Sequence, residues 1–269
     1  MTLYSDLALS RRLERTEGTA CARFAEARRR VYPDKNSEWI ESAGAIAVFD
    51  GADSPTTQSF GLGLFEELTP AKLDAVERFF LERGAPVNHE VSPLAGLATL
   101  DLLCSRNYRP VELSSVLYRL VDRPQPAPES SATAREIRPG EAPLWGEISA
   151  QAWANEYPDL LEFLREASAI AAVREHSPSF IAELDGQPGA AGSLCLHEGV
   201  ALLGGSATLP AMRRRGLQSA LVEARLLYAF DHKCDLAMMV AETGSNSQRN
   251  AERRGFKIAY TRTKWRLLQ

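Results

Sequence analysis

Apolar residues in the second half of the chain recur with two alternating periods, one typical of strands and the other of helices. Short apolar runs of strand length end at turn signals, of which Asp185-Gly186 is the strongest hairpin signal. The predicted strands are 134–138, 180–184, 191–196, 200–209, 235–241 and 257–267, and the predicted helices are 141–172, 216–231 and 245–254. Because this order combines hairpins with a crossover, it predicts a mixed sheet with helices on both faces.

The first half of the chain repeats the later part of that order. Its predicted strands are 43–49, 58–65, 86–91 and 111–121, and its predicted helices are 70–83 and 95–106. In both halves a helix is followed by a turn, an aromatic residue (Tyr108 or Phe256) and a closing strand. We interpret this correspondence as an internal duplication.

A segment with the composition of a linker separates the two halves. Residues 122–134 contain Pro124, Pro126 and Pro128 and no large apolar side chain, which is typical of a stiffened connection. The pattern therefore predicts two tandem domains, 1–121 and 135–269. Each is expected to belong to the α+β (mixed α/β) class, as a mixed, mostly antiparallel sheet flanked by helices.

Composition narrows the class of protein. The 269 residues are 45% hydrophobic and 25% charged, as in an ordinary soluble globular protein, and the net charge of −4 argues against a nucleic-acid partner. Four separate cysteines and four scattered histidines predict neither a disulfide framework nor a metal site. No apolar run of about 18 residues and no signal peptide are visible, so we expect no membrane partner and a cytoplasmic location.

The segment between the strand 200–209 and the helix 216–231 carries the strongest chemical signal. It contains Arg213, Arg214, Arg215 and Gly216 at the start of a helix, where unpaired N–H groups and the helix dipole favour an anion. Three cations oppose that dipole, so they are unfavourable there unless an anion binds. The segment therefore predicts a diphosphate site. The corresponding segment of the first half is acidic, with Glu66-Glu67, and predicts no such site.

At these residues the second half resembles the GCN5-related N-acetyltransferase superfamily. The family's cofactor motif is Arg/Gln-x-x-Gly-x-Gly/Ala, which Arg213 and Gly216 match, whereas Gln218 occupies the last small position. The run from Ser247 to Phe256 is similar to the family's later helix, which ends in Gly-Phe. The whole chain resembles the tandem type, with 1–121 as a degenerate acetyltransferase-like domain and 135–269 as the catalytic domain.

The resemblance implies acetyl-CoA as cosubstrate and a set of residues that hold it. The backbone of 206–208 would meet the pantetheine arm, the loop 214–219 would cradle the diphosphate, and Ser247 would face the same arm. The implied cofactor-binding residues are Ser206, Ala207, Thr208, Arg213, Arg214, Arg215, Gly216, Leu217, Gln218, Ser219 and Ser247.

Two departures from the family concern catalysis. Gly244 stands where the family often has an asparagine, and Ala251 stands where it often has the tyrosine that protonates the departing thiolate. An acceptor amine must still lose a proton, and the candidate bases are Glu183 and Glu242, with His197 and Tyr260 also near predicted strand ends.

The sequence thus predicts an acetyl-CoA-dependent N-acetyltransferase that acts on a small-molecule or peptide amine, as a monomer or homodimer. The alternative is a non-catalytic acyl-CoA sensor, since the family's tyrosine is absent. Two smaller features stay open. Gly204-Gly205 is either a mere strand bulge or a bulge that belongs to an active site. The aromatic and acidic region 145–163 is either a lip for a cationic amine or an ordinary amphipathic helix.

Overall fold

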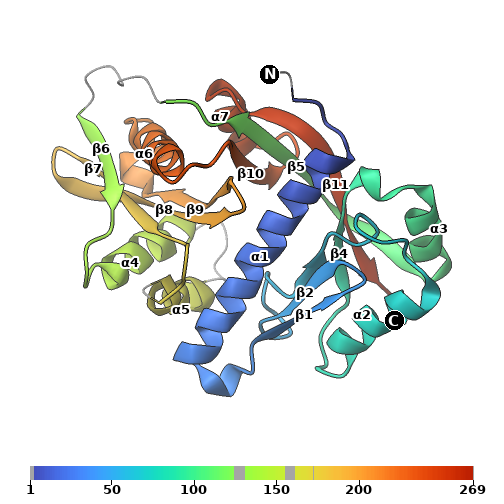
Figure 1. Cartoon of the computed structure of the whole chain (residues 1–269). Helices are drawn as coiled ribbons and strands as arrows, with labels where there is room; N and C mark the ends of the chain where they lie inside the picture. Colours follow the sequence, from blue (N-terminus) through green and yellow to red (C-terminus); the bar gives the residue numbers. More distant parts are fainter. Residues whose placement is uncertain (1–2, 124–130, 155–160, 172, 269) are drawn as a thin grey trace. The chain divides into compact units, whose positions relative to one another are not determined.

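The structure is a computed structural model, which describes residues 3–123, 131–154, 161–171 and 173–268 (Figure 1). The chain forms two compact units. The first comprises Met1–Arg119 together with Met238–Gln269, and the second comprises Leu120–Ala237. Mostly antiparallel strands flanked by helices make up both units, so the α+β class is confirmed.

The first unit contains the early elements and the last ones. Its helices are α1 (Leu7–Val31), α2 (Pro70–Leu81), α3 (Leu97–Ser105) and α7 (Asn246–Arg253). Its strands are β1 (Glu38–Ser42), β2 (Ala45–Phe49), β3 (Gln58–Phe60), β4 (Asn88–Val91), β5 (Tyr108–Leu120), β10 (Leu236–Glu242) and β11 (Lys257–Leu267). They neighbour one another in the order β1-β2-β3-β4-β11-β5-β10.

The last strand of the chain lies inside the sheet of the first unit. β11 pairs antiparallel with β4 on one side, from Thr263 opposite Val91, and with β5 on the other, from Lys257 opposite Tyr118. The compact units therefore differ from the predicted tandem halves 1–121 and 135–269, because this pairing places 238–269 with the first half. The duplication itself stays a prediction. Of the predicted linker, residues 124–130 lie outside the described part.

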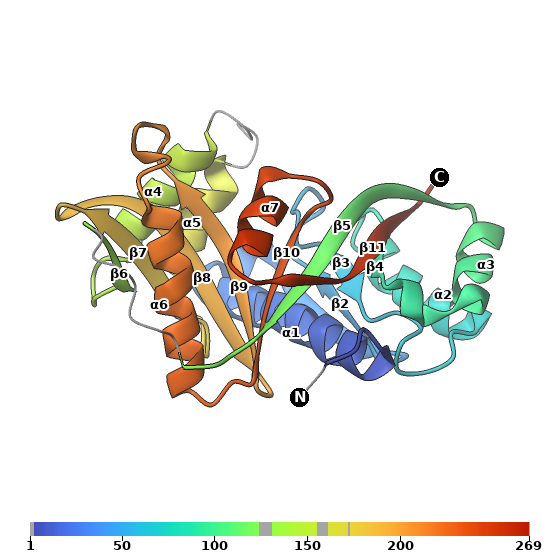
Figure 2. The same cartoon turned by 90° about the horizontal axis from the view of Figure 1, so that it is seen from above.

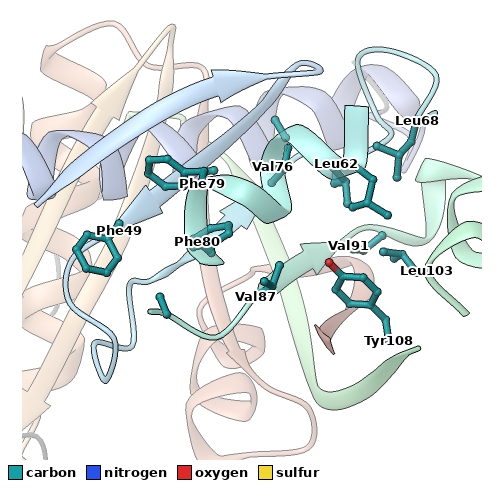
Figure 3. Packing of buried hydrophobic residues seen from close by; sticks show 14 residues of the cluster. Phe49, Leu62, Leu68, Val76, Phe79, Phe80, Val87, Val91, Leu103 and Tyr108 are labelled. Carbon is teal, nitrogen blue, oxygen red and sulfur yellow. The ribbon is translucent and has the colours of Figure 1, made fainter. Parts of the chain in front are cut away.

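β2 is buried on both faces and joins two apolar clusters. Ala45, Ala47 and Phe49 face the cluster built with α2 and α3, which Figure 3 shows at close range. Ile46 and Val48 pack against α1 instead. Because side chains alternate across a strand, consecutive residues of β2 reach opposite layers, and each must be apolar.

Helix α1 buries charged residues as well as apolar ones. Glu14 is buried on α1, and Arg262 of β11 donates to both of its carboxylate oxygens at 3.3 Å. Arg262 also bonds Glu17 at 2.6 Å and lies 2.9 Å from Glu90. Burial is the main cause that raises the pKa of Glu14 to about 7, while the Arg262 guanidinium acts in the opposite direction. The Tyr260 hydroxyl donates to Glu14 at 2.9 Å.

A second polar network lies inside the same unit. The His89 ring is 2.7 Å from the Ser59 hydroxyl and 3.0 Å from the Tyr108 hydroxyl, which in turn donates to Glu77. His89 and Ser59 are fully buried, and burial lowers the pKa of His89 to about 3. The imidazole is therefore neutral. Although Ser59 and His89 resemble a nucleophile and its base, their burial makes this pair a structural one.

The second unit contains antiparallel strands with helices on both faces. Its strands are β6 (Ala132–Glu136), β7 (Ser179–Leu184), β8 (Gln187–His197) and β9 (Val200–Thr208), in the order β9-β8-β7-β6. Its helices are α4 (Ala142–Trp153), α5 (Leu161–Ala171) and α6 (Leu217–Asp231). Figures 1 and 2 show α6 on one face of these strands and α4 with α5 on the other.

Candidate functional site

The loop between β9 and α6 has the geometry of an open anion receptor. A 3₁₀ turn over Pro210–Met212 leads into it. Arg214 (φ 63°) and Gly216 (φ 88°) both adopt the left-handed backbone conformation, which glycine tolerates and arginine adopts at a cost. Gly216 is the N-cap of α6 and offers no side chain to the first N–H groups of the helix. The helix start is thus left without a side-chain cap, at an exposed loop.

The three arginines of the loop have different surroundings. Arg213 donates to the backbone oxygens of Thr208 and Ala152, each at 3.3 Å, and thereby connects the loop to β9 and α4. Arg214 and Arg215 are exposed, and no contact of their side chains is found within the described residues. These two cations are available to phosphate groups, while Arg213 contributes to the shape of the loop.

A bulge interrupts β9 shortly before the loop. Ala191 pairs with Ala207 but Ser193 pairs with Gly204, so Gly205 and Ser206 together oppose only Gly192. Gly205 has a positive φ of 57°. The Gly204-Gly205 pair therefore lies at a bulge, a feature that often re-aims backbone groups beside active sites, and its place in an active site stays a prediction. The residues expected to meet the pantetheine arm, 206–208, begin within this bulge.

Arg225 of α6 donates hydrogen bonds to the backbone at this bulge. Its guanidinium is fully buried and donates to the backbone oxygens of Ser193 at 3.1 Å and Gly204 at 3.3 Å. Gly192 lies so close that a Cβ there would be 3.1 Å from the Arg225 Nη1. From the other face, Trp145 of α4 donates to the Gly192 oxygen at 3.1 Å. Side chains from both helices therefore fix the backbone at the bulge.

Arg225 has no carboxylate partner within the described residues, and desolvation lowers its pKa to about 9. The buried Ser206 hydroxyl nearby also lacks a hydrogen-bond partner there. The sequence could have indicated Arg225, because it occupies an apolar position of the helical pattern formed by Leu217, Leu221 and Ala229.

Two of the candidate bases, Glu183 and Tyr260, are already engaged in hydrogen bonds. Glu183 accepts a hydrogen bond from Arg135 at 2.7 Å, and the same guanidinium holds both oxygens of Glu141. Glu242 is exposed at the end of β10. Tyr260 donates to the buried Glu14, as described above, so it belongs to the interior of the first unit. His197 is half-buried next to Glu198.

The residues on α7 belong to the first unit, so their place beside the loop stays a prediction. Ser247 is exposed on α7, whose N-cap is Ser245. Ala251 is buried, so a tyrosine there would have to displace its neighbours. Of the aromatic and acidic region, residues 155–160 lie outside the described part, and Trp145 is a buried core residue.

The first half presents a closed helix start at the corresponding place. Thr69 caps α2 by accepting from the Lys72 N–H, and Pro70 removes one further N–H from the first turn. Lys72 pairs with Glu66 at 2.9 Å and donates to the Glu67 oxygen. That the first half binds no anion here stays a prediction.

Comparisons with known proteins agree with the motifs and the fold. Residues 142–256 match the sequence profile of the acetyltransferase (GNAT) family. A GCN5-related N-acetyltransferase from Kribbella flavida is 17% identical, with a TM-score of 0.65 over 93% of this chain and 96% of that chain. No curated protein matches this sequence.

Two further solved structures share the fold. A GCN5-related N-acetyltransferase from Sphaerobacter thermophilus is 17% identical, with a TM-score of 0.56 over 86% of this chain and 75% of that chain. A tandem GNAT protein from the clavulanic acid biosynthesis pathway is 14% identical, with a TM-score of 0.58 over 84% of this chain and 79% of that one. The profile match over residues 142–256 and the shared fold agree with the resemblance to the GCN5-related N-acetyltransferase superfamily. The family suggests acyl transfer from an acyl-CoA to an amine.

No group of three or more His, Cys, Asp or Glu side chains within the described residues could hold a metal ion. Within the same residues, no helix combines the length and apolar character needed to cross a membrane.

Proposed function

We propose that the protein transfers an acetyl group from acetyl-CoA to a primary amine of a small molecule or peptide. The observation that carries this proposal is the uncapped start of α6, at which Arg214 and Arg215 are exposed. Oriented N–H groups, the helix dipole and two cations together suit a diphosphate. The bulge at Gly205 and the following residues 206–208 would carry the pantetheine arm toward the reacting thioester.

Arg225 gives this proposal a structural basis beyond the motif. It belongs to the helix whose start receives the diphosphate, and it binds the strand that would receive the arm. Both halves of the cofactor site are therefore held by one rigid helix. Holding the thioester still can contribute several kcal/mol to the rate of transfer.

The alternative function is an acyl-CoA sensor without catalysis, and the buried Ala251 favours it because no acid can occupy that position. Catalysis does not depend on that acid, however. A thiol with a pKa of about 8.5 is a tolerable leaving group near neutral pH. We therefore retain the transferase as the main proposal.

Titration of acetyl-CoA into the full chain tests the cofactor site. Arg215→Glu should weaken binding by about tenfold or more, because a charge-assisted phosphate contact contributes about 1.5–3 kcal/mol. Arg109→Glu makes the same change of charge at an exposed position of β5 and should leave the affinity unchanged. Equal affinities in the parent and in both the Arg214→Ala and Arg215→Glu variants would contradict the assignment.

Release of free thiol over a panel of amines then separates transferase from sensor. Binding of acetyl-CoA without any amine-dependent release would favour the sensor. We further propose that Glu242 is the base, since Glu183 is already held by Arg135. Glu242→Gln should lower turnover most strongly at the acidic end of a profile from about pH 6 to 9. A profile that moves only in Glu183→Gln would reverse this choice.

A further inference from the structure

Arg225 occupies a position of α6 where the helical pattern calls for an apolar side chain. The other buried residues of this helix are Leu217, Leu221, Val222, Leu226 and Ala229. Burial of a cation without a carboxylate partner is costly, and a hydrophobic side chain of similar volume is often as stable or more stable at such a position. The stability of the helix therefore does not account for an arginine here.

The hydrogen bonds of Arg225 are directed at the bulge of β9. Its Nε donates to the Leu221 oxygen of its own helix at 3.0 Å, which orients the side chain. Its Nη1 then donates to the oxygens of Ser193 and Gly204, which are paired with each other where the register changes. The guanidinium thus holds both strands at one end of the bulge.

The residue opposite the bulge leaves room for this arrangement. A Cβ at Gly192 would lie 3.1 Å from the Arg225 Nη1 and 3.3 Å from the Ser206 Oγ, which is closer than most Cβ contacts. Regular pairing between strands is interrupted at a bulge, so the backbone conformation there depends on donors from side chains. We therefore expect the course of residues 205–208 to depend on Arg225.

We propose that Arg225 is a positioning residue for the pantetheine arm of the cofactor and acts by fixing the backbone of 206–208. This inference rests on the proposed acetyl-CoA site and divides that site into two parts. Arg214 and Arg215 bind the diphosphate at the start of α6. Arg225 lies eight residues beyond Leu217, about 12 Å along the helix axis, and sets the strand that meets the arm.

A comparison of two ligands separates the two parts. Adenosine diphosphate (ADP) has the diphosphate of coenzyme A without the pantetheine arm, whereas acetyl-CoA has both. In titrations of the full chain, Arg225→Met should weaken acetyl-CoA by about tenfold, because backbone hydrogen bonds to the arm are lost, and should leave the affinity for ADP unchanged. Arg215→Glu should weaken both ligands by similar factors.

Two further variants separate position from stability. Gly192→Ala keeps Arg225 but adds a Cβ that displaces its Nη1, so it should show the same selective loss of acetyl-CoA to a smaller extent. Leu226→Ala removes a buried side chain of the same helix that has no donor for the bulge. It should lower the unfolding midpoint and keep both affinities.

Release of free thiol at saturating acetyl-CoA and amine gives a kinetic measure of the same role. Arg225→Met should lower kcat by about tenfold or more, because a thioester that is held out of place reacts slowly, and Leu226→Ala should keep kcat per folded protein.

The proposal for Arg225 is overturned if Arg225→Met binds acetyl-CoA as the parent does, if it weakens ADP as much as acetyl-CoA, or if Leu226→Ala gives the same selective loss. A parent protein that binds neither ligand would instead overturn the proposed acetyl-CoA site itself.

Discussion

Acidification should destabilise the first unit through His89, the buried imidazole between the Ser59 and Tyr108 hydroxyls. Burial holds the pKa of His89 at about 3 in the folded protein, whereas an unfolded histidine titrates near about 6.5. Between these two values the unfolded chain binds a proton that the folded chain does not. Stability therefore rises with pH across this window, and it falls as the pH drops below about 6.5.

The size of the effect follows from these two pKa values. Between pH 7.5 and 5.5 the loss is about 1.4 kcal/mol of unfolding free energy, and by pH 4.5 it reaches about 2.7 kcal/mol. Solvent does not weaken this contribution to the unfolding free energy, because the His89 side chain is fully buried. A loss of this size is a large fraction of the stability of an ordinary domain.

Chemical denaturation of the parent and of His89→Gln, each at pH 7.5, 5.5 and 4.5, measures this contribution. The amide keeps a donor and an acceptor but does not titrate, and the difference between the two proteins cancels every other titrating group. That difference should change by about 1.4 kcal/mol between pH 7.5 and 5.5. The NMR signals of the His89 ring should stay those of the neutral form down to about pH 4.5. A difference that is constant with pH, or a ring that titrates near 6.5, would refute the reasoning.

Two other buried charges give predictions of their own. Burial raises the pKa of Glu14 to about 7, so between about pH 4.5 and 7 the folded state holds a proton that the unfolded state has lost, and stability falls as the pH rises. In denaturation experiments the parent should lose about 2 kcal/mol of unfolding free energy between pH 5 and 7 relative to Glu14→Gln. An equal pH dependence in both proteins would contradict this. Arg225→Lys should cost about 1–3 kcal/mol, because the shorter lysine side chain does not reach the position of Nη1, which donates to the Ser193 and Gly204 oxygens. An unchanged melting midpoint would show that these hydrogen bonds are dispensable.

Strong local patterns made much of the fold predictable. The predicted strand 257–267 has the bounds of β11, and the helix 216–231 differs from α6 by one residue. Helix α1 was not predictable from the apolar pattern, because its buried face carries polar residues, including Glu14 and Arg28, in place of an apolar stripe. The position of β11 between β4 and β5 was not predictable either, since strand order depends on contacts between distant residues.

The candidate site was likewise predictable only in part. The anion loop was visible because its chemistry is contained in four consecutive residues, Arg213 to Gly216. The two glycines Gly204-Gly205 indicated a bulge, and the register of β8 against β9 shows that Gly205 and Ser206 form it. The pairing of Glu183 with Arg135 was invisible, because the two residues are 48 positions apart and meet only through the β6–β7 pairing.

The place of β11 has a consequence for how the protein is made. β4 and β5 are complete when the ribosome has passed residue 120, but the strand that joins them ends at Leu267. At about 5–20 residues per second, the nascent chain must wait roughly 7–30 s for that strand. The unit 120–237 is contiguous and is finished before β11 is synthesised, so the middle of the chain can fold first. Meanwhile the edges of β4 and β5 stay open to pairing with other chains, which makes early release from the ribosome, or a premature stop, a direct route to aggregation.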